Sequence, residues 1–369
     1  MRRASHHAIG GGFRNPWPTA APPSLGGIVT WALAHRTTRP APIDPPRSAF
    51  QRAAPAFATP RATEDRLTIT WVGHATFLVQ VGGANVLTDP MWSDRASPWR
   101  WLGPRRWVAP GIALDKLPPV DAIVVSHDHY DHLDRATVRR LAASHPGAQW
   151  LGPLGVGARL RRFGAPDVRE LDWWDEADAG PLRIACTPAQ HVSGRGLRDR
   201  GRTLWCGWAL RGGSRRVFFA GDSAYHPTFA EVAARHGPFD VALLPIGGYE
   251  PRWYMQYLHM SPEDAVRALV ALAGGSRAAP PERQDTVGLV DEPHRSVATD
   301  INSSPGGPPK GNIASPRHRT VMIPMHWGTF KLTDEAMDEP PRRLRAAWAD
   351  AELPVEQLRV LAHGETTEL

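Results

Sequence analysis

The sequence predicts an α/β fold in which β-sheets pack together and helices cover them from outside. Apolar runs of strand length alternate with amphipathic helical segments through both halves of the chain. Of the 369 residues, 42% are hydrophobic, which is enough for a substantial core. Metal-capable side chains also recur where apolar strands end, the edge at which layered α/β folds usually carry their sites.

The first half of the chain supplies strands and one clear helix. Residues 67–90 contain three β-rich runs joined by tight turns, the second a Gly-Gly pair, as in a hairpin meander. A further strand is predicted at 121–126. The segment 135–145 predicts an amphipathic helix with Val138 and Leu141 on one side.

The second half repeats this alternation. Further strands are predicted at 181–187, 203–210, 215–221 and 240–246. A helix over 261–273 begins with Ser261 as N-cap and Pro262 in its first turn. A last strand at 320–325 precedes a closing helix around 341–350.

Two segments lack any such pattern. Residues 1–65 are rich in Pro, Ala and Arg and predict a partly ordered N-terminal arm. Residues 274–318 carry Pro, Gly, Ser and charge without periodicity, which predicts a disordered insertion. The expected organisation is therefore the arm, 1–65, followed by one large domain, 66–369, that contains the insertion.

The densest cluster of metal-capable side chains lies in 126-SHDHYDHLD-134. Alternate residues of an extended segment project to the same side, so His127 and His129 can present two imidazoles to one ion. Asp131 and His132 enter the next turn and can face a second ion. Burying so many titratable groups without a cation would be costly, so this motif predicts a metal centre. Imidazole and carboxylate suit zinc, and iron or manganese accept the same ligands.

Three single positions complete the predicted ligand set, because His191, Asp222 and His326 each follow an apolar strand. The assignment gives His127, His129 and His191 to one ion and Asp131, His132 and His326 to the other, with Asp222 bridging. Taken alone, each single position would more often be structural, since a strand-end Asp is commonly a helix cap. Asp128 and Asp134 are expected to support the imidazoles or cap the following helix.

Composition argues against several other classes of protein. The net charge is a modest +6 and no nucleic-acid module is evident, so no nucleic-acid partner is predicted. Cys186 and Cys206 form no CxxC motif, which argues against a thiolate zinc site, and both are expected to be buried thiols. No apolar run approaches the roughly 20 residues that span a bilayer. A cytoplasmic location is therefore predicted, with peripheral membrane attachment left open. His6 and His7 are expected at the surface.

Longer stretches resemble a known family. HxHxDH, a lone His, a Gly-Asp after a strand and a final strand-end His are similar to the metallo-β-lactamase superfamily. Its fold is an αββα sandwich, with two mixed sheets packed face to face and helices outside. Within that superfamily, residues 221–266 and 325-MHWGTFKLTDE-335 closely resemble N-acylphosphatidylethanolamine-hydrolysing phospholipase D and its bacterial relatives, and 13-FRNPW-17 resembles the entry segment of that family.

The resemblance implies a function and two further site residues. It implies two zinc ions per chain and a bridging hydroxide that splits a phospholipid into N-acylethanolamine and phosphatidate. The seven ligands of the family match the seven positions assigned above, with Asp222 and Asp131 also predicted to be catalytic. Tyr130 and His259 are implied to contact substrate. A homodimer is implied by the resemblance alone.

Rival interpretations stay open. A metal-dependent lactonase, another small-ester or phosphodiester hydrolase, a nuclease, or a non-catalytic metal-binding scaffold could carry the same ligand pattern. Arg252 is expected either to contact a phosphate or to form a structural ion pair. The segment 98-PWRWLGPRRW-107 is aromatic and basic, which makes it the best candidate for contact with an anionic lipid surface, the alternative being an ordinary packed loop.

Overall fold

A computed structural model of the chain describes residues 4–17, 42–196, 198–274 and 320–369. Part of the predicted arm and almost all of the predicted insertion lie outside these residues. Among the helices that are described, none is long and apolar enough to cross a bilayer.

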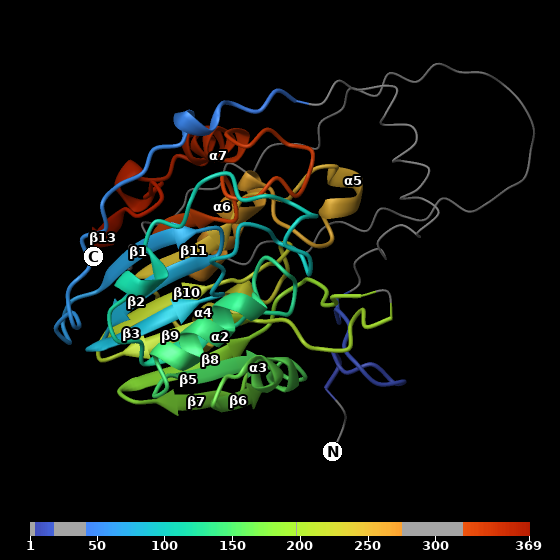
Figure 1. Cartoon of the computed structure of the whole chain (residues 1–369). Helices are drawn as coiled ribbons and strands as arrows, with labels where there is room; N and C mark the ends of the chain where they lie inside the picture. Colours follow the sequence, from blue (N-terminus) through green and yellow to red (C-terminus); the bar gives the residue numbers. More distant parts are fainter. Residues whose placement is uncertain (1–3, 18–41, 197, 275–319) are drawn as a thin grey trace, which may run out of the picture.

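The first sheet is seven-stranded, with the order β13-β1-β2-β3-β4-β5-β6 (Figure 1). Its strands are β1 (Thr68–Gly73), β2 (Thr76–Val81), β3 (Ala84–Thr88), β4 (Ala122–Val124), β5 (Gln149–Pro153), β6 (Asp167–Leu171) and β13 (Thr366–Glu368). The strands β13, β1, β2 and β3 pair antiparallel, whereas β3 to β6 pair parallel. The crossovers of the parallel part contain α2 (Arg135–Ser144) and α3 (Gly157–Phe163).

The second sheet is six-stranded, with the order β12-β11-β10-β9-β8-β7. Its strands are β7 (Glu176–Ala179), β8 (Leu182–Thr187), β9 (Gly207–Gly212), β10 (Arg215–Phe219), β11 (Val241–Pro245) and β12 (Val321–Met325). Here β7 to β10 pair antiparallel and β10 to β12 parallel. The remaining helices are α4 (Phe229–His236), α5 (Arg252–Met255), α6 (Pro262–Leu272) and α7 (Glu339–Asp350), with 3₁₀ turns η1 (Arg47–Ala49), η2 (Leu114–Lys116) and η3 (Val355–Gln357).

Strands buried on both faces hold the layers together. Successive side chains of a strand point to opposite faces. Trp71 and Phe77 therefore enter the core between the sheets, whereas their neighbours Val72 and Leu78 pack outward in a second core that includes Leu141 of α2. Helices α4, α6 and α7 contribute to the first core. The structure thus confirms the predicted αββα sandwich of two mixed sheets.

Most predicted elements are present, and the differences have structural reasons. Strand β9 begins at Gly207, later than the predicted 203, because the backbone N–H groups of Leu204 and Cys206 bond to Leu154 and Ser126 instead of joining the ladder. Strand β6 was not predicted, since its sequence DVREL is half exposed and polar. Strands β5, β7 and β13 and helices α3, α4 and α5 were likewise missed.

The N-terminal residues 4–17 pack onto the domain. The expected surface position of His6 and His7 is wrong for His6, which is buried with its ring stacked 4.2 Å from that of Trp173. The Nε2 atoms of His6 and His7 each lie 2.7 Å from a different carboxylate oxygen of Asp172. Each imidazole therefore has its own acceptor, and this cluster needs no cation.

Candidate metal centre

One edge of the sandwich receives all seven predicted ligands. Strands β8, β10 and β12 run in the same direction, so their C-terminal ends share one edge of the second sheet. His191, Asp222 and His326 follow those three ends. The motif 127–132 leaves β4 of the first sheet at the same edge, where the carbonyl of Ser126 accepts a hydrogen bond from Cys206, the residue just before β9 of the second sheet.

Three histidines form the first group of side chains. The Nδ1 atom of His129 lies 2.8 Å from Nε2 of His127 and 3.2 Å from Nε2 of His191. These three ring nitrogens lie within 4.8 Å of one another. Ring nitrogens this close repel unless a proton or a cation lies between them, so the arrangement suits a metal ion.

Asp131, His132 and His326 form the second group. The Oδ2 atom of Asp131 lies 3.3 Å from Nε2 of His132 and 3.5 Å from Nε2 of His326. Two nitrogens and a carboxylate oxygen therefore lie close together and form a second set of metal-capable donors.

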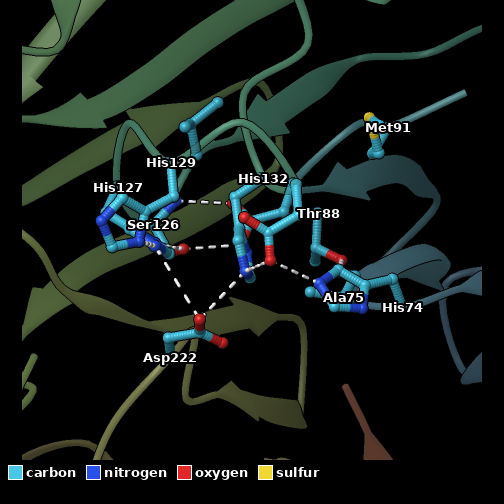
Figure 2. A network of polar contacts seen from close by, with 12 residues as sticks. His74, Ala75, Thr88, Met91, Ser126, His127, His129, His132 and Asp222 are labelled. Carbon is cyan, nitrogen blue, oxygen red and sulfur yellow. Dashed lines mark hydrogen bonds and ion pairs between the residues drawn. The ribbon is translucent and has the colours of Figure 1, made fainter. Parts of the chain in front are cut away.

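Asp222 lies between the two groups (Figure 2). Its Oδ2 atom is 3.1 Å from Nε2 of His132 and 3.2 Å from Nε2 of His326. The same oxygen is 3.9 Å from Nε2 of His127 and 3.8 Å from Nε2 of His191. One carboxylate oxygen thus faces both groups, which is the geometry of a bridging ligand.

Outer hydrogen bonds fix the direction in which several imidazoles present their lone pairs. Ser126 donates from Oγ to Asp89, so that oxygen accepts from Nδ1 of His127 at 2.9 Å. The Nδ1 atom of His132 lies 2.7 Å from the carboxylate of Asp89, and Nδ1 of His191 lies 2.9 Å from a backbone carbonyl. With Nδ1 protonated, Nε2 of each ring carries a lone pair that points inward, as metal-binding histidines require.

Buried polar atoms without partners point to the same conclusion. Within the described residues, Nε2 of His132, Nε2 of His326 and Oδ1 of Asp222 are buried and accept or donate no hydrogen bond. Such orphaned groups are costly, and a cation would satisfy them. The donors are nitrogen and oxygen, and both cysteines are buried thiols outside the cluster, as predicted. The residues present therefore fit a zinc-type site.

Electrostatics show that protons and metal compete for this centre. Burial lowers the pKa of His326, but the carboxylates of Asp222 and Asp131 outweigh it and raise the pKa to about 9. Burial raises the pKa of Asp222, but His132 and His326 hold it well below its ordinary value. In the absence of metal the centre therefore retains protons, which a bound cation must displace.

His74 belongs to the second group, although the sequence interpretation placed it only in a turn. Its Nε2 atom lies 2.8 Å from Oδ2 of Asp131, and its ring centroid is 4.1 Å from that of His326. Burial lowers the pKa of His74 to about 3, so the ring is neutral and donates from Nε2. The signal was available, because His74 follows a strand just as His191 and His326 do.

The two predicted substrate residues occupy different places. His259 lies in the centre: its Nδ1 atom is 3.9 Å from Oδ2 of Asp222, and this nitrogen is buried without a hydrogen-bond partner among the described residues. Tyr130 is half-buried at the rim. It donates from its hydroxyl to the carbonyl of Arg195, whose guanidinium lies 3.8 Å from the centre of its ring.

Asp134, Asp128 and Arg252, each of which had more than one expected role, make structural contacts. Asp134 caps α2 by accepting from the backbone of Ala136 and Thr137. Asp128 accepts from the backbone of Gly194 and pairs with Arg159 at 2.9 Å. Arg252 forms an ion pair with Asp264 and donates to the carbonyl of His259, so it holds the backbone beside the site.

Asn15 also reaches the centre and was not singled out from the sequence. Its Nδ2 atom donates to the carbonyl of His191 at 3.0 Å, and its Oδ1 atom accepts from the indole of Trp205 at 3.2 Å. The segment 13–17 thus supports the backbone of one candidate ligand. Only its resemblance to a family segment could have drawn attention to it.

Comparisons with known proteins identify relatives of this chain. The profile of the beta-lactamase superfamily domain matches residues 84–280. An uncharacterized protein of Mycobacterium tuberculosis is 40% identical over 326 residues, which cover 87% of this chain and 73% of that protein. The N-acyl-phosphatidylethanolamine-hydrolyzing phospholipase D 1 of Caenorhabditis elegans is 42% identical over 214 residues, 55% of this chain and 60% of the worm protein.

A solved structure supports the fold independently. The isothiocyanate hydrolase from Delia radicum gut bacteria superposes with a TM-score of 0.56 at 19% identity, covering 81% of this chain and 98% of that one. Identity this low speaks for the fold alone. The sandwich fold, the clustered histidines and the matched relatives together support the conclusion that the protein is a metal-dependent hydrolase. The chain belongs to the metallo-β-lactamase superfamily.

Proposed function

We propose that this protein is a zinc-dependent phosphodiester hydrolase that splits N-acylphosphatidylethanolamine into N-acylethanolamine and phosphatidate. The observation that carries the proposal is the pair of donor groups that share one oxygen of Asp222. The 214-residue similarity to the worm phospholipase D supports the choice of substrate.

Two divalent ions are proposed for the two groups. One ion would be held by His127, His129 and His191. The other would be held by Asp131, His132 and His326, and Asp222 would contact both. Bound divalent ions supply Lewis acidity, which polarises a phosphoryl oxygen and lowers the pKa of water. Zinc suits the nitrogen and oxygen donors, and iron or manganese would be accepted by the same set.

The surrounding residues keep these donors in place. Asp89 accepts from both His132 and Ser126, so one buried carboxylate orients ligands of both groups. His74 does the same for Asp131 through a single 2.8 Å hydrogen bond. Because a shift of about 1 Å in a reacting group can cost 100-fold in rate, this support is part of catalysis.

His259 and Tyr130 are proposed to bind the substrate. Burial lowers the pKa of His259 to about 4, so the imidazole is neutral at pH 7. Its unpartnered Nδ1 atom, 3.9 Å from Asp222, can then donate a hydrogen bond to a phosphoryl oxygen. Tyr130 stands at the rim, where its ring can pack against the departing N-acylethanolamine.

The test is release of N-acylethanolamine and phosphatidate from the lipid by zinc-loaded protein, with and without chelator. Asp222→Asn should lose more activity than the roughly 10- to 100-fold typical of an outer partner, and should lower the zinc content. Asp178→Asn is the matched control, because Asp178 lies on β7 in an exposed ion pair with Arg183 and should keep full activity.

Two outcomes would contradict the proposal at different levels. Unchanged zinc content in Asp222→Asn would remove Asp222 from the metal centre. Zinc-loaded protein that hydrolyses lactones or small phosphodiesters but never the lipid would overturn the substrate while leaving the hydrolase in place.

A further inference from the structure

Residues 94–106, here called the tryptophan loop, form a paired stem with an exposed tip. The backbone N–H of Arg106 donates to Asp94 at 2.7 Å, and that of Ala96 donates to Pro104 at 3.1 Å. The guanidinium of Arg95 adds a 2.6 Å bond to the carbonyl of Gly103. The tip is therefore held in a defined position.

The tip concentrates exposed apolar surface. Trp99, Trp101 and Leu102 are 54%, 73% and 50% exposed. Within the residues that the structure describes, eight large hydrophobic side chains are exposed, and three of them lie between positions 99 and 102. Because a single exposed apolar side chain is ordinary but a cluster is not, the tip is a candidate contact surface.

The same tip is basic. Arg100 and Arg105 are exposed, and residues 98–107 contain no acidic side chain. Across the described part of the chain, no ion pair ties either guanidinium to a carboxylate. Indole rings favour the headgroup region of a bilayer, and guanidinium groups favour its anionic phosphates. The chemistry of the tip therefore matches a lipid surface.

The stem connects this tip to the wall of the metal centre. Arg106 donates to the carbonyl of Met91 at 2.7 Å, and its guanidinium lies 4.8 Å from the ring centre of Phe330. The ring of Phe330 packs edge-on against His74 at 5.3 Å. Met91 and His74 appear on the same side of the site in Figure 2. The base of the tryptophan loop therefore packs against Phe330, which in turn contacts His74 of the second group.

We propose that the tryptophan loop docks the protein on an anionic phospholipid bilayer by inserting Trp99, Trp101 and Leu102 at the headgroup level. This inference rests on the proposed function, because docking on a bilayer would bring the protein to its phospholipid substrate. A bilayer fits better than a second protein copy, because three side chains bury far less than the roughly 1,200 Å² of a stable interface. The two exposed arginines also favour a partner dense in negative charge.

The test measures binding of the zinc-loaded full chain to phosphatidylcholine vesicles with and without phosphatidylglycerol, by co-sedimentation. The double variant Trp99→Ala/Trp101→Ala should lower partitioning to the anionic vesicles by about tenfold or more. The matched control is Ile43→Ala/Val355→Ala, which removes two other exposed apolar side chains and should bind like the parent. Zinc content and unfolding temperature should be the same in all three proteins.

Charge is tested separately. Arg100→Gln/Arg105→Gln should reduce the preference for anionic vesicles and flatten the salt dependence of binding. Unchanged partitioning of the tryptophan double variant would overturn the proposal. So would a result in which that variant loses self-association instead of vesicle binding. The vesicles contain no N-acylphosphatidylethanolamine, so the outcome does not depend on whether the protein hydrolyses that lipid.

Discussion

His74 combines a rare backbone conformation with a contact to a candidate ligand. Its φ angle is +57°, in the left-handed region that is uncommon for residues other than Gly and in which Asn, Asp and His are enriched. Its backbone N–H donates to Thr329 and its carbonyl accepts from the indole of Trp71. The strained residue is thus held from both sides, and its imidazole is aimed at Asp131.

Substitutions of His74 should distinguish the effect of its backbone conformation on stability from the effect of its side chain on metal binding. His74→Ala loses the bond to Asp131 and should reduce zinc affinity and hydrolysis by roughly 10- to 100-fold. His74→Asn should unfold at a higher denaturant concentration than His74→Ala, because Asn tolerates a positive φ. Zinc titration and urea unfolding measure the two effects. Wild-type zinc affinity in His74→Ala would show that His74 does not position Asp131.

The sequence located single residues best where they were crowded or followed apolar strands. The HxHxDH motif and the three strand ends gave the seven positions that the structure brings together. His74 was not recognised, because a polar residue between two strands is ordinary in a turn. Asn15 could not be recognised from periodicity, since its role comes from a contact 176 positions away in the chain.

At the scale of elements, the segment 4–17 acts as a brace against the loop that follows β8. Phe13 donates from its backbone to Gly201, and Asn15 donates to His191. Trp17 stacks on Trp173 at 5.7 Å. The brace therefore joins the loop that carries His191 to the region around β7.

Removing one contact of this brace should weaken the metal centre. Asn15→Ala should cost about 1–2 kcal/mol of unfolding free energy, the usual effect of losing buried hydrogen bonds, and should lower zinc affinity. Asn15→Asp should be worse, because a carboxylate would face the carbonyl of His191. Both effects can be measured by urea unfolding and zinc titration.

Arg14→Ala is the control for the brace, since Arg14 is exposed and contacts only the carbonyl of Ser5 through its side chain among the described contacts. It should change stability by less than about 0.5 kcal/mol. Equal stability and zinc affinity in Asn15→Ala and Arg14→Ala would show that the hydrogen bonds of Asn15 do not support the metal centre.

Some elements could be predicted and others could not, for a physical reason. Strands β1, β2 and β11 are buried on both faces and so form continuous apolar runs. Strand β7 buries its two alanines and exposes charged side chains on the other face, and β6 buries only Leu171, so both short runs are hard to tell from a loop. Helix α6 was recognised because Ser261 and Pro262 mark a helix start, and in the structure Ser261 and Asp264 also form a complete capping box.

At the scale of the whole molecule, a buried histidine couples stability to pH. His226 lies between Trp17 and Phe229, with ring centroids 4.7 and 4.1 Å away. Burial lowers its pKa from 6.5 to about 3. As pH falls below 6.5 the unfolded chain takes up a proton that the folded chain refuses, so stability decreases until about pH 3.

His226→Phe should remove this share of the acid sensitivity. Between pH 7 and pH 5 the parent should lose up to roughly 2 kcal/mol more unfolding free energy than the variant, because one pKa unit corresponds to about 1.4 kcal/mol. Urea unfolding of both zinc-saturated proteins at the two pH values gives the difference, and the other histidines cancel in it. Identical losses in the two proteins would mean that His226 keeps its ordinary pKa when folded.

The spacing of the candidate ligands along the chain has a consequence for biosynthesis. Asp222 lies 95 residues after His127, and His326 lies 199 residues after it. A nascent chain on the ribosome exposes the HxHxDH motif long before the oxygen that joins the two groups has been made. Complete metal capture must therefore wait until translation has passed residue 326. Until then the early histidines offer only a partial site that releases its ion easily.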